Sequence, residues 1–196
     1  MQDNLYLEAI DTLRQWVEEA REAGEVEPTA MTLSTVNEAG QPSARVVLLK
    51  ALDADGPVFY TNLHSRKGGE LRGQPKVALC FYFTRLDRQV RVEGTASIVS
   101  DEQADAYFAS RDRGSQLGAW ASQQSQPLAA RQELEDRIAS LDQQYEGQPV
   151  PRPPHWSGVR VTPVAMEVWQ GRAHRVHERW RYEAGADGWR KSLLQP

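Results

Sequence analysis

Five short β-rich segments, separated by turns, dominate the first half of the chain and restrict the folds that it can form. They cover residues 30–36, 43–52, 57–62, 76–83 and 88–99. Asn-Glu-Ala-Gly and Asp-Ala-Asp-Gly separate the first three, and Thr-Arg-Leu-Asp separates the last two. These are turn residues, and connections this short join antiparallel neighbours. The sequence therefore predicts a mainly antiparallel sheet, and the spacing favours a small barrel over a parallel α/β sheet.

Helices are predicted on both sides of these segments. Residues 1–24 form the first, because apolar residues recur there at helical spacing and Gly24 lies where a C-cap glycine belongs. Residues 101–146 form a helical insertion, with Ser100 as the expected N-cap before an acidic start. Four prolines within residues 148–154 then mark a linker, since they exclude both a helix and a central strand.

The pattern typical of strands returns after the linker. It covers residues 157–169, 173–182 and 188–194, with a final turn at 183–188. We expect these strands to rejoin the barrel. A length of 196 residues fits one domain, so the prediction is a single domain over residues 1–196, mainly β with flanking helices.

Composition and charge exclude several classes of protein. No apolar run approaches the roughly 20 residues that span a bilayer, and the N-terminus lacks the basic start and apolar stretch of a signal peptide. The single cysteine, Cys80, excludes an intrachain disulfide and a multi-cysteine zinc site. A net charge of −4 argues against a general nucleic-acid binder. We therefore expect a cytoplasmic protein without a nucleic-acid or membrane partner.

A basic pair, Arg66-Lys67, follows the third β-rich segment and begins a short predicted helix. Ser65 is the expected N-cap of that helix. Two cations at a helix start oppose the macrodipole, and a bound phosphate would remove this conflict because helix N-termini favour anions. The alternative is a solvated pair in a loop.

Arg45 and Lys50 flank the apolar run Val46–Leu49. In a regular strand their odd and even positions point to opposite faces of the sheet. We therefore do not expect them to hold the same part of one ligand. Either they contact two ligands, or one of them lies on the surface.

Tyr107, Arg111 and Ser115 are spaced i, i+4 and i+8. On a continuous helix this spacing puts a phenol, a guanidinium and a hydroxyl on one face. The three groups suit a phosphate monoester, which the guanidinium binds in a bidentate manner. Gly114 would interrupt such a helix, and the alternative is an exposed helix face.

Three neutral polar residues, Gln123, Gln124 and Ser125, end a run that starts at Gly118. Their donors and acceptors suit the edge of a heterocycle. As an alternative, they cap the helix that begins near Pro127.

Residues 169–179 combine tryptophan, arginine and histidine in an unusual density. As a strand, this segment places Arg175, His177 and Arg179 on one face, where they repel each other unless an anion lies among them. Trp169 and Trp180 bracket the segment and indicate partial burial, which favours a functional site. The alternative is a solvated edge strand protected by its charge.

These segments, in this order, resemble the pyridoxamine/pyridoxine 5′-phosphate oxidase family. The matching stretches are PTAMTLSTV, RVVLLK, VFYTN, SRK, RQVRVEG, YFASR, QLGAWASQQS, HWSGVR and WQGRAHRVHER, and they span Pro28 to Trp189. The resemblance implies an antiparallel, FMN-binding split β-barrel that forms a homodimer. It also implies an oxidase that uses FMN and molecular oxygen to convert pyridoxamine or pyridoxine 5′-phosphate to pyridoxal 5′-phosphate, with release of hydrogen peroxide.

The resemblance also implies a set of site residues, some of them from the second subunit. The residues expected at FMN are Arg45, Val46, Val47, Leu48, Lys50, Tyr60, Thr61, Arg66, Lys67, Gln89, Gln124, Ser125, Trp169 and Arg179. The residues expected at the substrate are Lys50, Tyr107, Arg111, Ser115, Arg175 and His177. Of these, Arg175 and His177 are expected beside the pyridine ring as the catalytic residues.

Three departures from the family pattern accompany the resemblance. The family usually has a longer N-terminal leader that covers the active site, so a more open site, weaker catalysis or another substrate is expected here. Leu193-Leu194-Gln195-Pro196 stands where the family tends to end in Arg-Leu-x-Pro, and His155-Trp156-Ser157-Gly158 replaces the more usual Trp-Gly-Gly.

Two alternative functions follow from the same fold. One is an FMN oxidase of another aromatic substrate, which the phosphate-binding set around Lys50 and Arg111 opposes. The other is a non-catalytic flavin or pyridoxal-phosphate carrier, which Arg175 and His177 oppose.

Overall fold

The structure is a computed structural model that describes residues 3–196. Along the chain the elements are α1 (Asn4–Glu22), β1 (Ala30–Val36), β2 (Pro42–Leu48), β3 (Ala51–Asp53), β4 (Gly56–Asn62), α2 (Arg66–Gly73), β5 (Lys76–Phe83), β6 (Arg88–Ile98), α3 (Asp101–Ala109), α4 (Arg113–Ala121), α5 (Arg131–Gln144), β7 (Trp156–Gln170), β8 (Glu178–Gly185) and β9 (Gly188–Leu194). Short 3₁₀ turns lie at Thr84–Leu86 and Ala173–Arg175.

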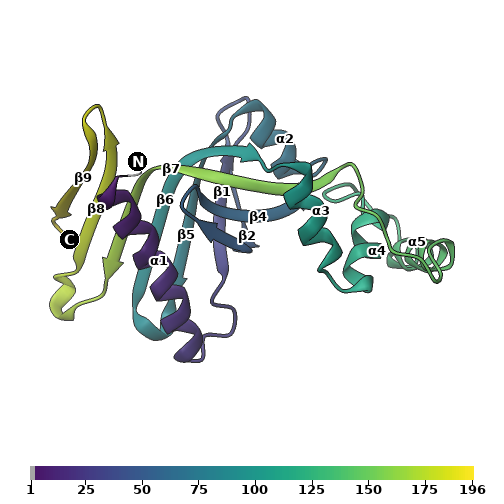
Figure 1. Cartoon of the computed structure of the whole chain (residues 1–196), viewed down its shortest axis with the longest axis horizontal. Coiled ribbons are helices and arrows are strands. Elements are labelled where there is room, and N and C mark those ends of the chain that lie inside the picture. The colour runs from purple at the N-terminus through teal and green to yellow at the C-terminus, as the bar shows by residue number, and fades with distance from the viewer. Residues whose placement is uncertain (1–2) are drawn as a thin grey trace.

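All the strands belong to one antiparallel, strongly curled sheet (Figure 1). The order is β2-β1-β5-β6-β7-β4-β3, with β8 paired to β7 and β9 paired to β8. The long strand β7 organises this sheet. One edge of β7 pairs with β6, while the other edge pairs first with β4 and then, over Ala165–Gln170, with β8. The last two strands therefore join the same sheet, at the end away from α3–α5 (Figure 1).

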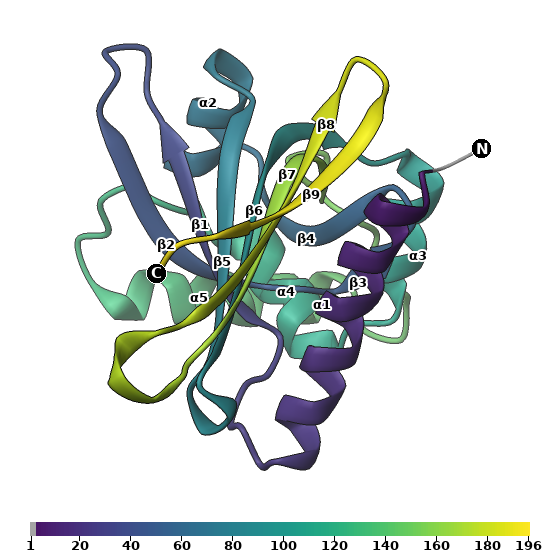
Figure 2. The ribbon, with the colours of Figure 1, turned by 90° about the vertical axis from the view of Figure 1, so that its left-hand side faces the viewer.

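Helix α1 packs beside the sheet (Figure 2) because one of its faces is apolar. Asp3 begins the helix as the N-cap, accepting a hydrogen bond from the backbone N–H of Leu5, and Gly24 follows its end at φ +76°. The buried face of α1 consists of Tyr6, Ala9, Ile10, Leu13, Trp16, Val17 and Ala20. It meets the apolar residues of the sheet in one core, which includes Leu33, Phe81 and Val92.

The predicted helical insertion consists of three helices, α3, α4 and α5. Ser100 caps α3 as expected, through the N–H of Gln103, and Asp112 caps α4 through the N–H of Ser115. Tyr107, Arg111 and Ser115 therefore do not lie on one continuous helix, because α3 ends at Ala109 and the chain restarts at the Asp112 cap. The break precedes Gly114, which lies inside α4.

The predicted strand over residues 43–52 is also two strands. Its first half, β2, pairs with β1, and its second half, β3, pairs with β4. The exchange of partners occurs between two neighbouring residues: the N–H of Leu49 bonds to Thr29 O, and that of Lys50 bonds to Val58 O. The strands at the two ends of the order β2-β1-β5-β6-β7-β4-β3 are thereby consecutive in the chain.

The predicted strand over 173–182 begins only at Glu178. β7 ends at Gln170, opposite the first residue of β6, so residues 171–177 have no strand to pair with and turn back into β8. Within this turn His174 and Arg175 have left-handed backbone, at φ 58° and 62°. Arg175, His177 and Arg179 therefore do not share one face of a strand, and the alternation argument fails there.

None of the helices in the described part of the chain is long and apolar enough to cross a membrane.

Candidate active site

A cavity of about 970 Å³ lies between β2, β4, α2, α3 and α4. Its volume is within the range of roughly 300–1,000 Å³ typical of ligand and cofactor sites. Twelve of the expected residues line it: Arg45, Val46, Val47, Leu48, Lys50, Tyr60, Thr61, Lys67, Tyr107, Arg111, Ser115 and Gln124. We call these twelve the cavity group. Arg45 and Lys50 thus meet at one cavity, because the strand that was expected to separate them ends at Leu48.

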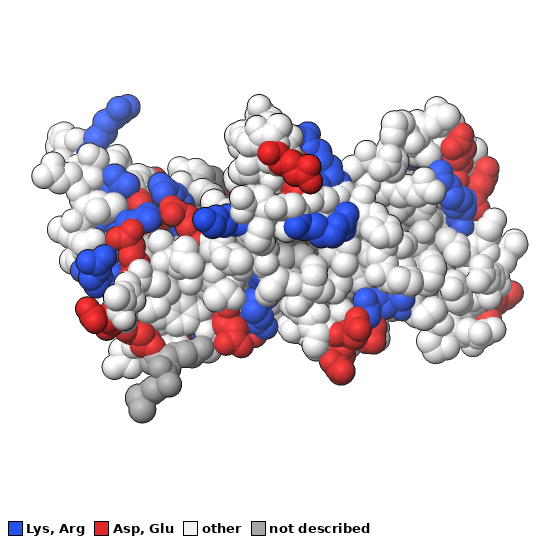
Figure 3. Space-filling view, turned by 90° about the horizontal axis from the view of Figure 1, so that it is seen from above, with Lys and Arg blue, Asp and Glu red and all other residues white. Residues whose placement is uncertain are grey.

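The charge of the cavity wall is predominantly positive. Arg45, Lys50, Lys67 and Arg111 line it, against one carboxylate, that of Asp112. On the face of the molecule in Figure 3, by contrast, basic and acidic side chains are interspersed. The concentration of positive charge in the cavity is a local feature, and it suits a ligand that carries more than one negative charge.

The start of α2 forms one wall of this site. Ser65 is the N-cap, as expected: its hydroxyl accepts the N–H of Gly68 and donates to Asn62 O. The N–H of Arg66 donates to Ser125 Oγ over 3.2 Å. Ser125 therefore contacts the start of α2, whereas the helix near Pro127 begins without a side-chain cap, which excludes the alternative role.

Lys67 projects into the cavity from the same turn. Its ammonium group donates to Gln124 Oε1 over 2.8 Å and to Ser65 Oγ over 3.3 Å, both of them neutral oxygens. Burial, followed by the nearby charge of Arg45, lowers the pKa of Lys67. An anionic ligand at this position would oppose the charge of Arg45 and raise the pKa of Lys67 again, which makes Lys67 a suitable phosphate-binding group.

On the opposite wall, Arg111 lies among aromatic rings. Its guanidinium is 4.8 Å from the ring centroid of Trp156, and the rings of Tyr60 and Tyr107 stack with centroids 3.9 Å apart. Nη1 of Arg111 is buried and has no hydrogen-bond partner within residues 3–196, and burial lowers the pKa of the guanidinium. A buried unpaired donor costs stability, so the site fits a ligand that brings an anionic oxygen to it.

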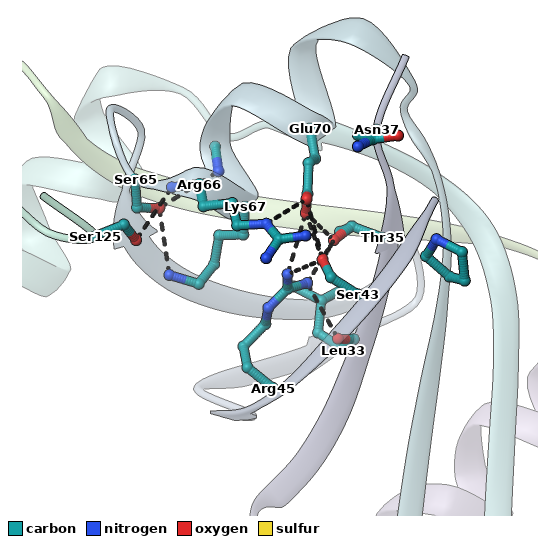
Figure 4. Close-up of polar contacts among 12 residues, drawn as sticks. Leu33, Thr35, Asn37, Ser43, Arg45, Ser65, Arg66, Lys67, Glu70 and Ser125 are labelled. Carbon is teal, nitrogen blue, oxygen red and sulfur yellow. Dashed lines mark hydrogen bonds and ion pairs between the residues drawn. The ribbon is translucent and has the colours of Figure 1, made fainter. Parts of the chain in front are cut away.

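Glu70 of α2 is a site residue that the sequence analysis missed (Figure 4). It is buried and pairs with both Arg45 and Arg66. The i, i+4 spacing from Arg66 on a short predicted helix was the one signal that could have indicated it. Trp156 and Asn62 also line the cavity and were not expected there.

Five expected residues lie elsewhere: Gln89, Trp169, Arg175, His177 and Arg179, which we call the β7–β8 group. The sheet register sets Gln89 beside Trp169, and Trp169 beside Arg179, on three adjacent strands. The ring of His177 is 4.7 Å from that of Trp169. None of the five is among the residues that line the cavity. In Figure 1, β8 and α4 lie at opposite ends of the molecule.

Comparison with known proteins decides the family. The family model "Pyridoxamine 5′-phosphate oxidase" matches residues 16–145, and "Pyridoxine 5′-phosphate oxidase C-terminal dimerisation region" matches residues 156–196. The chain belongs to the pyridoxamine 5′-phosphate oxidase family. Membership of this oxidase family agrees with the resemblance on which the sequence analysis relied.

Relatives within the family are similar over nearly the whole chain. The pyridoxine/pyridoxamine 5′-phosphate oxidase of Rubrobacter xylanophilus is 56% identical over 189 residues, which cover 95% of this chain and 87% of the relative. That of Myxococcus xanthus is 56% identical over 187 residues, covering 95% and 91%. These matches confirm the predicted activity, an FMN-dependent oxidase of pyridoxine and pyridoxamine 5′-phosphate.

Solved structures confirm the predicted split-barrel fold of this oxidase. PhzG from Burkholderia lata, solved in complex with tetrahydrophenazine-1-carboxylic acid, has a TM-score of 0.91 at 32% identity, covering 95% of this chain and 92% of PhzG. A pyridoxamine 5′-phosphate oxidase-related, FMN-binding protein from Nostoc punctiforme has a TM-score of 0.75 at 19% identity, covering 93% and 97%, and shows the fold alone.

Proposed function

We propose that the cavity holds FMN together with the phosphorylated vitamer, and that the residues expected from the sequence act there. Two cations of the cavity wall, Lys67 and Arg111, carry this proposal, because neither has an anionic partner among the residues that the structure describes. They lie on two different walls, on α2 and between α3 and α4. Two separate cationic positions suit two phosphate groups, one on the cofactor and one on the substrate.

The FMN phosphate is assigned to the start of α2. There Arg66 and Lys67 supply charge, Thr61 and Ser125 supply hydroxyl groups, and the helix N-terminus supplies the positive end of its dipole. The backbone of Val46–Leu48 lies beside the isoalloxazine in this proposal, and the guanidinium of Arg45, which bonds to Glu70 of α2, lies at the phosphate end. When bound, FMN would supply the redox chemistry, as the acceptor of a hydride from C4′ of the substrate and the donor of electrons to molecular oxygen.

The substrate phosphate is assigned to the wall that carries Arg111. Lys50, Tyr107 and Ser115 line the cavity with it, so charge and hydroxyl donors converge there despite the break between α3 and α4. A phosphate carries a charge near −2 at about pH 7. Binding this remote group orients the reacting end of the substrate as well as holding it.

A second copy of the chain is proposed to supply the β7–β8 group. The match of residues 156–196 to a dimerisation region supports a homodimer, and this segment contains Trp169, Arg175, His177 and Arg179. Val46 on the cavity wall and Val176 beside Arg175 are each 65% exposed in the single chain, which suits burial against a partner. Arg175 and His177 of the partner would then hold the pyridine ring and its phenolate oxygen.

One domain over residues 1–196 and a cytoplasmic location stay predictions. The continuity of all the strands in one sheet supports the first.

An oxidase of another aromatic substrate remains the second candidate. The similarity to PhzG, whose structure contains a phenazine carboxylic acid, favours it. Against it stand the higher identity to pyridoxine/pyridoxamine 5′-phosphate oxidases and the cationic wall around Arg111, which a substrate without a phosphate does not need.

Oxygen consumption tests the proposal. The FMN-loaded protein is expected to turn over pyridoxamine 5′-phosphate or pyridoxine 5′-phosphate, with much lower kcat/KM for unphosphorylated pyridoxine. Equal kcat/KM with and without the phosphate would contradict the substrate site. Absence of turnover with every vitamer, despite bound FMN, would favour the carrier or the second substrate class.

A further inference from the structure

Glu70 lies at the centre of a buried polar cluster behind the cavity wall (Figure 4). The carboxylate accepts hydrogen bonds from four side chains that come from three different elements. Its partners are Thr35 on β1, Ser43 and Arg45 on β2, and Arg66 on α2. The side chain of Glu70 is only 5% exposed.

The same cluster fixes the guanidinium of Arg45 from several sides. Nη1 donates to Leu33 O and to Thr35 Oγ1, and Nη2 donates to Ser43 Oγ and, over 3.1 Å, to Glu70 Oε2. Arg45 is one of the residues that line the cavity, whereas Glu70 is not. Glu70 therefore contacts the cavity only through its partners.

The second arginine of the cluster is held in a different manner. Arg66 Nε donates to Glu70 Oε1 over 2.9 Å, one turn along α2, while the rest of the Arg66 side chain is largely exposed. This ion pair turns the guanidinium along the helix, beside the N-terminal turn that Ser65 caps. Without it, a long side chain at the surface would sample many rotamers.

Burial alone would raise the pKa of Glu70, but the hydrogen bonds from Thr35, Ser43, Arg66 and Arg45 outweigh it and lower the pKa to about 2. The group is a carboxylate at neutral pH. Removing one partner of such a buried pair leaves the other charge uncompensated.

We infer that Glu70 is a positioning residue, which holds the guanidinium groups of Arg45 and Arg66 where the phosphate end of FMN binds, while touching neither cofactor nor substrate. The inference rests on the proposed function, since it requires FMN at the start of α2. Glu70 thereby assists the binding of a phosphate, although its own negative charge repels that group.

Charge and positioning predict opposite results for Glu70→Gln. A negative charge near a phosphate repels it, so the substitution would tighten FMN binding if charge were the main effect. If Glu70 acts by positioning, the substitution frees both arginines and weakens FMN binding. Riboflavin has no phosphate, so its affinity should not change in either case.

The experiment measures the dissociation constants of FMN and riboflavin from flavin fluorescence, after removal of the bound cofactor. We expect Glu70→Gln to weaken FMN binding by about tenfold to a hundredfold, with riboflavin binding unchanged. Glu135→Gln, which removes a carboxylate from the exposed ion pair with Arg131 on α5, is the matched control and should change neither constant. Unchanged or tighter FMN binding in Glu70→Gln would overturn the inference.

A second pair of variants tests whether Glu70 acts through Arg45. In an Arg45→Met background, Glu70→Gln should cost less FMN affinity than in the wild type, because one of the two groups that it positions is gone. Equal costs in both backgrounds would overturn the role assigned to Arg45.

A replacement variant and a measurement on the wild type distinguish failure of the inference from failure to fold or failure of the proposed function. If the Glu70→Gln chain does not fold, Ser43→Ala tests the same cluster by removing a hydroxyl that bonds to both Glu70 and Arg45, and an unchanged ratio of FMN to riboflavin affinity would overturn the inference. A wild-type protein that binds FMN no better than riboflavin would instead contradict the proposed phosphate site, and the inference with it.

Discussion

The backbone N–H of Arg172 donates a hydrogen bond to Nδ1 of His177 over 3.2 Å. Because Nδ1 is the acceptor in this contact, the neutral imidazole carries its hydrogen on Nε2. The Arg172 side chain also bonds to Gln170 and Glu178, which flank the turn. His177 is thus held as a hydrogen-bond donor through Nε2.

The donor role of His177 predicts that His177→Ala slows flavin reduction only modestly. The rate of anaerobic flavin reduction should fall by less than about a hundredfold, because a lost donor costs less than a lost acid or base, for which roughly 10²–10⁴-fold is typical. His177→Gln, which can place an amide N–H near Nε2, should retain more of the rate. A loss in the full acid–base range in both variants, at unchanged FMN content, would contradict the donor role.

Arg111→Ala should remove the preference for phosphorylated substrates. The buried Nη1 has no other partner, so we expect kcat/KM for pyridoxine 5′-phosphate to fall by about a hundredfold or more, with little change for pyridoxine. Arg113→Ala is the matched control, since that arginine bonds to Asp142 and carbonyl oxygens away from the cavity. Equal losses in the two variants would count against the phosphate site.

Two adjacent glycines of α2 should respond to alanine with opposite signs. A Cβ at Gly68 would lie 2.1 Å from Leu63 O, a backbone atom that cannot move freely, whereas the nearest atom to a Cβ at Gly69 is 4.0 Å away. Gly69→Ala should therefore stabilise the protein by about 0.5–1 kcal/mol through helix propensity. Gly68→Ala should lower the free energy of unfolding and the FMN affinity together. Urea unfolding measures the stability of the two variants, and flavin fluorescence measures their FMN affinity. Equal changes in the free energy of unfolding would show that the start of α2 is loosely packed.

Acid should weaken the protein partly through Glu70. Its pKa falls from 4.5 to about 2 on folding, so its contribution to stability is fully present above the unfolded value and is lost as the pH falls toward the folded one. A shift of this size corresponds to about 3 kcal/mol. The difference in unfolding free energy between wild type and Glu70→Gln should therefore shrink by that order between pH 6 and pH 2. A difference independent of pH would mean that Glu70 titrates normally.

The sequence predicted correctly those helix starts that are determined by contacts between residues close together in the chain. Ser65 and Ser100 begin helices because each hydroxyl accepts an N–H three residues ahead, and such a contact is visible in the sequence. The partner exchange at Leu49 and Lys50 was missed because it depends on β1 and β4, whose places in the sheet no local pattern reveals.

The residues of the candidate site also divide into those that the sequence predicted and those that depend on distant contacts. The cavity group was predicted largely from the family resemblance, and all twelve of its members line one cavity. Glu70 was missed because its importance arises from partners 25–35 positions away. The strand geometry assumed for Arg175 and His177 was wrong because β6 ends its pairing with β7 at Gln170, and nothing in residues 171–177 indicates where a partner strand stops.

The separation of the cavity group from the β7–β8 group has a genetic consequence. In the proposed dimer each site takes its cavity from one chain and its Arg175 from the other. A hybrid of an Arg111→Ala chain with an Arg175→Ala chain would then contain one doubly defective site and one intact site. Two impaired proteins, mixed and allowed to exchange subunits at random, would have about a quarter of their sites intact. A substitution in the cavity group and one in the β7–β8 group would complement each other.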